Sequence, residues 1–328
     1  MKDFGAFCRH IIRKGDTTDM NDKVTISLFE LASKYPTDGS ARTFLEEQRW
    51  HGMPKCPHCG SSVHQHKHHH KGEQGYYHCS TCNQVYTVRT GTIFERSHIG
   101  LAKWLFALYY ILTARKGVSS LQLSKHLGIT QKSTWFMLQR IRTAMSAGSI
   151  KLSGTVEIDE AYIGGKENNK HESKKLNQGR GSVGKTAVMG IKERDGNVVA
   201  TVVENANKET AEAIIEQNIA SDATVNTDES NIYNGVSTKR KHVKVNHSAK
   251  VFVDGMASTN GIESVWAVLK RMFYGTYHQF SKKHLQRYVD ECTFRLNQGN
   301  CKIHVLDRMN SIINGGFRNH ITYQALVA

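Results

Sequence analysis

The stretch that decides the fold is Thr155-Val-Glu-Ile-Asp-Glu-Ala-Tyr-Ile-Gly-Gly165. Its apolar start predicts a short strand over Val156–Ile158, and the glycine pair breaks the chain soon afterwards. Asp159 is therefore expected at the end of this strand, close to the surface. The chain as a whole carries a net charge of +15. An acid held at a strand end in so basic a protein calls for a functional explanation.

Strands and helices follow one another on the C-terminal side of this stretch. Further strands are predicted over Thr186–Lys192, Asn197–Val203, Ala223–Asn226 and Lys241–Val245, and helices over Lys208–Ile219, Asn260–Phe273 and Lys282–Leu296. The hairpin turn Asp195-Gly196 joins two of the strands. This order predicts an α/β domain over residues 152–300, built on a mixed sheet with flanking helices.

Three acids are candidates for one site in this domain. Asp159 and Asp228 each follow a predicted strand, and Glu263 falls in the first turn of a predicted helix. Because parallel strands bring their carboxyl ends to one sheet edge, the two aspartates are expected to lie close together. Lys270 shares the helix face of Glu263. Carboxylates suit Mg²⁺, and two such ions about 3.5–4 Å apart can promote phosphodiester cleavage.

Two neighbouring acids, Glu157 and Glu160, are interpreted as supporting or solvated side chains rather than ligands. Glu157 has the same strand parity as Asp159, and Glu160 has the opposite parity. An acid at a strand end or on a helix is usually a solvated surface residue. The three acids are therefore interpreted as one site because of their order on the fold and because the segments that precede this domain are predicted to bind DNA.

Four of the seven cysteines form two Cys-x-x-Cys pairs, Cys56/Cys59 and Cys79/Cys82. Such pairs bring four thiolates to one tetrahedral ion, and they favour Zn²⁺ over an iron–sulfur cluster or disulfides. Residues 52–95 are therefore predicted to form a zinc ribbon with a structural zinc ion.

Residues 98–148 are predicted to form a helix-turn-helix DNA-binding domain. Ser119 or Ser120 can cap one helix, Gly128 makes a turn, and Thr130 caps the next helix. The alternative is a three-helix packing unit without contacts in a DNA groove. The candidate DNA contacts are polar and basic residues of the last helix, namely Lys132, Gln139, Arg140 and Arg142.

The two ends of the chain are less informative. Residues 1–51 are assigned to an N-terminal helical segment, and residues 301–328 to a C-terminal tail. No apolar run approaches the roughly 18 residues of a membrane span, and the first twenty residues lack the apolar core of a signal peptide. With three unpaired cysteines, these features predict a cytoplasmic protein.

Several segments together resemble the zinc-ribbon transposases of bacterial insertion sequences, within the DDE transposase and retroviral-integrase superfamily. The matching segments are the two cysteine pairs, Val156–Gly165, Thr227-Asp228 and Thr259-Asn-Gly-Ile-Glu-Ser-Val-Trp-Ala-Val-Leu-Lys-Arg271. The last of these is the most specific. In one departure from the family pattern, Ser258 stands where relatives often carry a histidine.

The resemblance implies an RNase H-like fold for the sheet domain. It also implies that Asp159, Asp228 and Glu263 form the catalytic triad and hold Mg²⁺ or Mn²⁺, with Lys270 as the trailing lysine.

The sequence thus predicts a DNA transposase that binds the terminal inverted repeats of an insertion sequence and catalyses strand cleavage and strand transfer. The expected partners are double-stranded DNA and at least one further copy of the chain, because two ends must be joined. This function predicts that the protein lies in the bacterial cytoplasm and associates with the nucleoid. Two alternatives stay open: a catalytically inactive DNA-binding regulator derived from a transposase, and a nuclease that cuts without joining.

Overall fold

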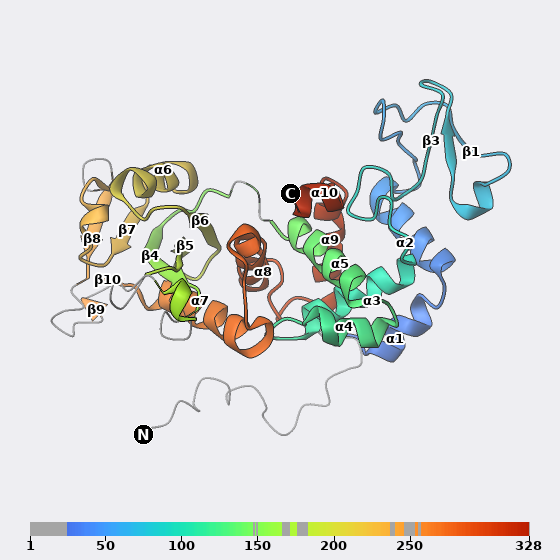
Figure 1. Cartoon of the computed structure of the whole chain (residues 1–328). Helices are drawn as coiled ribbons and strands as arrows, with labels where there is room; N and C mark the ends of the chain where they lie inside the picture. The colour runs from blue at the N-terminus through green and yellow to red at the C-terminus, as the bar shows by residue number, and fades with distance from the viewer. Residues whose placement is uncertain are drawn as a thin grey trace, which may run out of the picture.

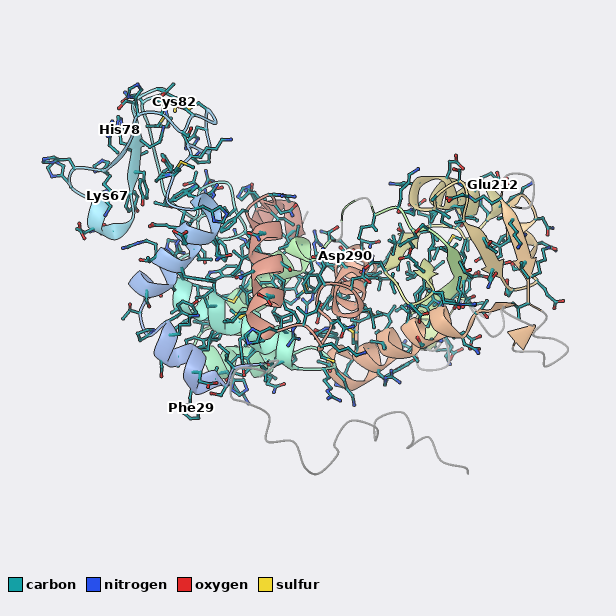
Figure 2. All side chains as sticks on the ribbon, turned by 180° about the vertical axis from the view of Figure 1, so that it is seen from behind. Phe29, Lys67, His78, Cys82, Glu212 and Asp290 are labelled. Atoms are coloured by element: carbon teal, nitrogen blue, oxygen red, sulfur yellow. The ribbon has the colours of Figure 1, made fainter. Side chains whose placement is uncertain are left out.

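The computed structural model describes residues 25–146, 148, 150–165, 171–175, 183–236, 240–245, 253–254 and 257–327 of the chain. Figure 1 shows a ribbon and a group of helices at one end and a sheet at the other. Figure 2 places Cys82 of the ribbon and Glu212 of the sheet half far apart, with Asp290 between them. Within the described residues, no helix is long and apolar enough to cross a lipid bilayer.

Seven helices build the helical half of the molecule. They are α1 (Leu28–Lys34), α2 (Asp38–Trp50), α3 (Leu101–Thr113), α4 (Ser120–Leu127), α5 (Gln131–Ala144), α9 (Val305–Gly316) and α10 (Tyr323–Val327). The side chains of Ser119 and Thr130 cap α4 and α5, and Gly128 ends α4 in the left-handed region. A Gly-containing turn between two capped helices therefore connects α4 to α5 as predicted. The contact of these helices with DNA stays a prediction.

Residues 301–328 do not form a tail, which corrects the predicted domain boundary. Helix α9 packs against α3 and α5 and buries Met309, Ile312 and Ile313 in the same core as the N-terminal helices. An amphipathic helix at the end of the chain completes that core because the earlier helices leave an apolar surface for it to cover. The helical half thus consists of two segments separated by the whole sheet domain.

The small ribbon projects from α2. Its three antiparallel strands are β1 (Gln65–Lys67), β2 (Tyr77–Cys79) and β3 (Gln84–Tyr86), with the short helix η2 (Gly72–Gln74) between the first two. The Trp50 ring lies edge-on to the rings of Tyr77 and Tyr86, with centroids 5.1 and 5.8 Å away. This aromatic contact fixes the ribbon to the end of α2.

The sheet half contains a five-stranded mixed sheet in the order β6-β5-β4-β7-β8. Its strands are β4 (Thr155–Ile163), β5 (Thr186–Glu193), β6 (Val198–Val203), β7 (Thr224–Thr227) and β8 (Lys241–Lys244). Strands β4, β7 and β8 are parallel, and β5 is antiparallel to β4 and β6. The predicted α/β fold with a mixed sheet is therefore confirmed, in the strand order of an RNase H-like domain.

Helices cover both faces of this sheet. Helix α6 (Lys208–Asn218) packs on one face, and α7 (Asn260–Met272) and α8 (Leu285–Leu296) pack on the other. Shorter elements complete this half: η4 (Glu172–Lys174), η5 (Asn231–Tyr233), β9 (Val253–Asp254), β10 (Ala257–Ser258), the π-helix η7 (Phe273–Tyr277) and η8 (Lys282–His284).

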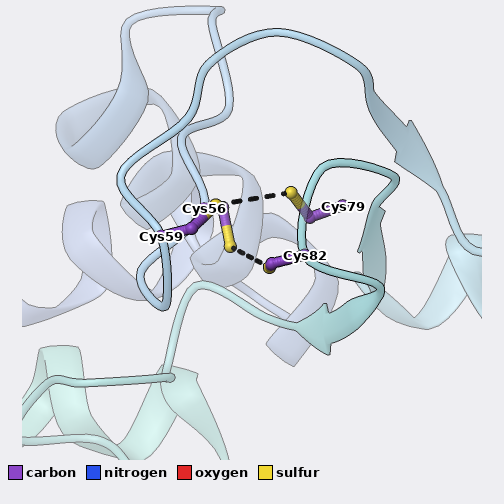
Figure 3. A group of neighbouring side chains, drawn as sticks. All are labelled: Cys56, Cys59, Cys79 and Cys82. Atoms are coloured by element: carbon purple, nitrogen blue, oxygen red, sulfur yellow. Dashed lines mark hydrogen bonds between the residues drawn. The ribbon is translucent and has the colours of Figure 1, made fainter.

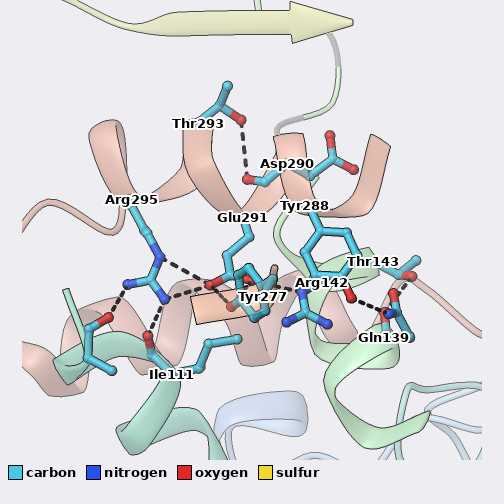
Figure 4. A network of polar contacts seen from close by, with 11 residues as sticks. Ile111, Gln139, Arg142, Thr143, Tyr277, Tyr288, Asp290, Glu291, Thr293 and Arg295 are labelled. Carbon is cyan, nitrogen blue, oxygen red and sulfur yellow. Dashed lines mark hydrogen bonds and ion pairs between the residues drawn. The ribbon is translucent and has the colours of Figure 1, made fainter. Parts of the chain in front are cut away.

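A buried ionic network joins the two halves where α5 meets α8 (Figure 4). Arg142 of α5 lies 2.8 Å from the Glu291 carboxylate, and Arg295 lies 2.7 Å from its other oxygen. The Tyr277 hydroxyl donates to the same carboxylate at 2.9 Å. Burial alone would raise the pKa of Glu291, but the two arginines outweigh it and the pKa is lowered. The carboxylate is thus held ionised by charges of the chain itself.

Candidate active site and zinc centre

Asp159 lies in the middle of β4 rather than at its end. The predicted strand Val156–Ile158 is too short, because antiparallel pairing with β5 continues through Asp159, which is opposite Gly190. The Trp266 indole nitrogen of α7 donates a hydrogen bond to Asp159 Oδ2 at 2.9 Å. A Cβ at Gly190 would come within 2.5 Å of the Trp266 ring. Glycine at this position therefore lets α7 approach close enough to hold the carboxylate.

Asp228 follows β7 directly and lies beside Asp159. The parallel register of β4 and β7 pairs Glu157 with Asn226, which brings the residues that follow β7 to the same region of the sheet as Asp159. Asp228 is near enough for its charge to raise the pKa of Asp159. Asp228 Oδ1 accepts a hydrogen bond from the Ser230 backbone N–H at 3.0 Å. This bond fixes the turn after β7 and the direction of the carboxylate.

Burial and nearby charge change the pKa of Asp159. The pKa of Asp159 is raised to about 6, most of all by burial and then by the negative charge of Glu160. Asp228 raises it further, whereas hydrogen bonds from the backbone and from Trp266 lower it. A carboxylate in these surroundings is stabilised by an added cation, since a positive charge favours its ionised form. The donor set therefore fits a hard divalent ion such as Mg²⁺ or Mn²⁺.

Glu157 anchors helix α7 to the sheet. Glu157 is buried, and its Oε2 accepts a hydrogen bond from the Ile262 backbone N–H at 3.0 Å. Glu157 Oε1 lies 3.6 Å from the Arg194 guanidinium. The carboxylate thus supplies an acceptor for an N–H group at the start of α7, where the helix dipole also favours negative charge. Of the two interpretations left open for Glu157, support of the site fits these contacts.

Glu263 and Lys270 are both exposed on α7. Glu263 lies three residues before Trp266 and shares its helix face, while Lys270 lies one turn after Trp266. In the described part of the chain, the potential metal-ligating group of three or more side chains is that of the four cysteines. The structure therefore sets Asp159 beside Asp228 but does not gather the triad with Glu263 at metal-binding spacing.

Glu160 takes a larger part in this region than the sequence indicated. It accepts a hydrogen bond from the Tyr233 hydroxyl at 2.7 Å, and the Tyr233 ring is fully buried. Burial is the largest cause of the raised pKa of Glu160, and Asp228 raises it further. The bond ties β4 to the segment after Asp228. A tyrosine five residues beyond Asp228 was the only signal of this contact in the sequence.

The four cysteines of the ribbon converge from the two predicted pairs (Figure 3). Their Sγ atoms all lie within 4.8 Å of one another. Cys56 Sγ lies 3.6 Å from Cys82 Sγ, and Cys59 Sγ lies 3.7 Å from Cys79 Sγ. Tetrahedral zinc–thiolate bonds of about 2.3 Å place sulfur atoms about 3.8 Å apart. The thiolates therefore have the spacing that a structural zinc ion requires.

Two family models match the chain. The transposase zinc-ribbon domain matches residues 36–85, and the ISXO2-like transposase domain matches residues 151–297. The chain belongs to the zinc-ribbon transposases of insertion sequences. The first match covers the cysteine site, and the second contains Asp159, Asp228, Glu263 and Lys270.

Two individual proteins are similar to this chain. An uncharacterized protein in transposable element ISH50 of Halobacterium salinarum is 31% identical over 130 residues. The match covers 39% of this chain and 43% of the relative, so the chain spans less than half of that protein. A chain in the simian T-cell lymphotropic virus intasome complex with PP2A regulatory subunit B56 gamma is 16% identical, with a TM-score of 0.26. That match covers 56% of this chain and 64% of the other, and at this TM-score it adds nothing on fold or function.

Three of the four predicted DNA contacts are buried, which corrects the prediction. Gln139, Arg140 and Arg142 are at most 4% exposed. Arg140 donates to the backbone carbonyl of Ile93 at 2.7 Å, and Gln139 lies 3.3 Å from the Tyr288 hydroxyl. These side chains serve packing because α5 is covered by the sheet half and by α9.

Lys132 is the exposed member of that predicted set. Its ammonium lies 5.3 Å from the centre of the Tyr323 ring of α10, a cation–π distance. It stays a candidate for contact with a DNA phosphate.

Proposed function

We propose that this transposase binds the terminal inverted repeats of its insertion sequence and catalyses metal-dependent DNA strand cleavage and strand transfer. The observation that carries the proposal is the proximity of Asp159 on β4 and Asp228 directly after the parallel strand β7, in a transposase-family domain. The raised pKa of Asp159 supports a cation there, because neighbouring negative charge increases the benefit of a bound metal ion.

Asp159, Asp228 and Glu263 would hold Mg²⁺ or Mn²⁺. Bound ions would supply activation of the attacking oxygen and stabilisation of the leaving oxygen at phosphorus. The chain itself would hold the two carboxylates in place, because Trp266 orients Asp159 and the Ser230 N–H orients Asp228. Glu263 is exposed on the helix face of Trp266, and the proposal requires a change of rotamer to bring its carboxylate towards the aspartates.

The remaining parts of the chain would hold DNA. The zinc ribbon and the α4–α5 unit would bind the terminal repeats, with Lys132 at a backbone phosphate, and the net charge of +15 favours a polyanion. The family assignment also supports double-stranded target DNA as a partner. Two ends must meet for strand transfer, so we propose a dimer or larger assembly on DNA. The protein would act on the nucleoid in the cytoplasm.

The test is Asp228→Asn, with Glu229→Gln as an exposed acidic control one residue away. We expect the Asn variant to lose about a thousandfold or more of cleavage and strand transfer in Mg²⁺, since metal-ion catalysis contributes several kcal/mol. The control is expected to keep activity, and both variants are expected to stay folded. Full strand transfer by Asp228→Asn would overturn the site assignment.

The wild-type reaction separates the alternative functions. DNA that carries the element's ends is incubated with the wild-type protein and Mg²⁺, and cleaved strands and covalent joint molecules are measured. Cleavage without joint molecules would identify a nuclease. Binding without cleavage would identify an inactive regulator.

A further inference from the structure

A cleft of about 240 Å³ lies where β4 ends beside the C-terminal part of α7. Two tyrosines, Tyr162 and Tyr274, and two lysines, Lys185 and Lys270, are among the residues that line it. The described lining contains no acid. The volume is below the range of about 300–1,000 Å³ that holds drug-sized ligands, so the cleft suits a single small ring system.

The two tyrosines are more exposed than aromatic side chains of a core. Tyr162 is 39% exposed and Tyr274 is 58% exposed. The buried Phe273 ring, which also lines the cleft, lies edge-on to Tyr274 with its centroid 4.9 Å away. A single exposed aromatic is ordinary on a protein surface. Two that border one cleft, one of them edge-on to a buried ring, form a platform on which a flat ligand can stack.

The lysines give the cleft a positive charge. Lys270 is exposed and Lys185 is half-buried, and both side chains line the same small space. A lysine presents a compact charge that suits a phosphate oxygen. Aromatic faces beside lysines match the two parts of a nucleotide, because a base stacks on aromatic rings and its phosphate pairs with cations.

The cleft is formed by the same two elements, β4 and α7, that hold Asp159. Tyr162 is three residues beyond Asp159 on β4, a distance of about 10 Å along a strand. Lys270 is one helical turn beyond Trp266, which bonds Asp159, and a turn rises about 5.4 Å. A nucleotide in the cleft would therefore be within a few nucleotides of the phosphate that reacts at Asp159.

We propose that this cleft holds one unpaired nucleotide of the DNA strand, next to the reacting phosphate. Its base stacks on Tyr162 and Tyr274, and its phosphate contacts Lys185 and Lys270. Paired bases are stacked within the duplex, so a base can enter such a cleft only after it leaves the helix. The inference rests on the proposed transposase reaction and adds to it a requirement for local melting at the element's end.

The test combines protein variants with abasic DNA in a double-mutant cycle. Single abasic nucleotides are placed at each position around the cleaved phosphate, and the cleavage rate is measured for the wild type, Tyr162→Ala and Tyr274→Ala. At one position we expect the abasic nucleotide to slow the wild type about tenfold, within the roughly 5- to 140-fold range of base–aromatic stacking. The same abasic nucleotide should slow the Ala variants little, because the stacking partner is already gone.

Conservative variants and a remote control complete the experiment. Tyr162→Phe and Tyr274→Phe keep the ring and are expected to keep the wild-type rate within about twofold. Phe29→Ala removes an aromatic ring that is 85% exposed and lies far from the sheet in Figure 2, and it is expected to change nothing.

If the loss of cleavage rate from the abasic nucleotide and the loss from the Ala substitution add up at every DNA position, the nucleotide site is overturned. Phe variants that cleave as slowly as the Ala variants would also overturn it. Both outcomes leave the proposed transposase function intact. A wild-type protein that does not cleave the end in Mg²⁺, or that cleaves it without forming joint molecules, would remove that function.

Discussion

Glu291 at the α5–α8 interface and Asp159 on β4 lie in opposite electrostatic surroundings. Glu291 is fully buried against Arg142 and Arg295, and its pKa is lowered despite the burial. Asp159 is partly buried beside Glu160, and its pKa is raised to about 6, first by burial and then by that neighbour. The chain thus neutralises one buried carboxylate with its own cations and leaves negative charge concentrated around the other.

The difference separates a structural ion pair from a candidate metal site. Neutralising a buried carboxylate within the chain joins two helices, and removing one partner leaves an expensive uncompensated charge. Accumulated carboxylate charge instead destabilises the metal-free fold and is relieved by an external cation. The four cysteine thiolates belong with Asp159 in this respect, because they too are ligands that need an added ion.

Zinc removal should give the largest effect. Structural zinc supplies about 10–16 kcal/mol of apparent binding free energy in small zinc modules, so chelation is expected to unfold residues 52–95. The sheet half has its own core and should stay folded. Limited proteolysis with and without chelator measures both regions. If the ribbon resists protease without zinc, its cysteines do not need an added ion, and their grouping with Asp159 is wrong.

Glu291→Gln should give the next largest effect. It leaves Arg142 buried without its carboxylate partner, which is expected to cost about 3–5 kcal/mol in the free energy of unfolding. Denaturant titration measures the loss. Glu216→Gln is the matched control, because the Glu216–Arg240 pair at 2.9 Å has an exposed carboxylate and should cost at most about 1 kcal/mol. Equal losses in the two variants would contradict a special role for the buried network.

Asp159→Asn should act in the opposite direction and stabilise the protein without magnesium. A carboxyl with a raised folded-state pKa contributes stability that is complete below its unfolded pKa of 3.8 and lost as pH rises through about 6. Above pH 6 the ionised side chain is a cost, so its removal should add about 2–3 kcal/mol at pH 8. The gain should be about 1 kcal/mol smaller at pH 5.

Denaturant titrations of the zinc-loaded protein at the two pH values provide the measurement. Asp222→Asn, at an exposed position, is the control and should leave stability unchanged at both. A destabilised Asp159→Asn protein at pH 8 would show that Asp159 is compensated by the chain in the same way as Glu291, and the comparison would fail.

The zinc site and the element types could be predicted from the sequence because both depend on local spacing. Two Cys-x-x-Cys pairs are enough to bring four thiolates together. Apolar periodicity and turn residues similarly indicate strands and helices within a few residues of their bounds. The β-forming segments next to Asp159 and Asp228 were also readable, and the parallel pairing of β4 with β7 then brought the two aspartates near each other.

Only the tertiary structure decided which polar side chains face solvent and which are used for packing. Arg142 is 149 residues from Glu291 in sequence, and Arg140 finds its carbonyl acceptor 47 residues away, so nothing local marks either arginine as buried. The same holds for Glu157 at the start of α7, for Glu160 with Tyr233, and for the insertion of α9 into the helical core. The sequence by itself determined the cysteine cluster and the order of the strands and helices, because spacing along the chain is a local property. The burial of a charge depends on partners that only folding brings together.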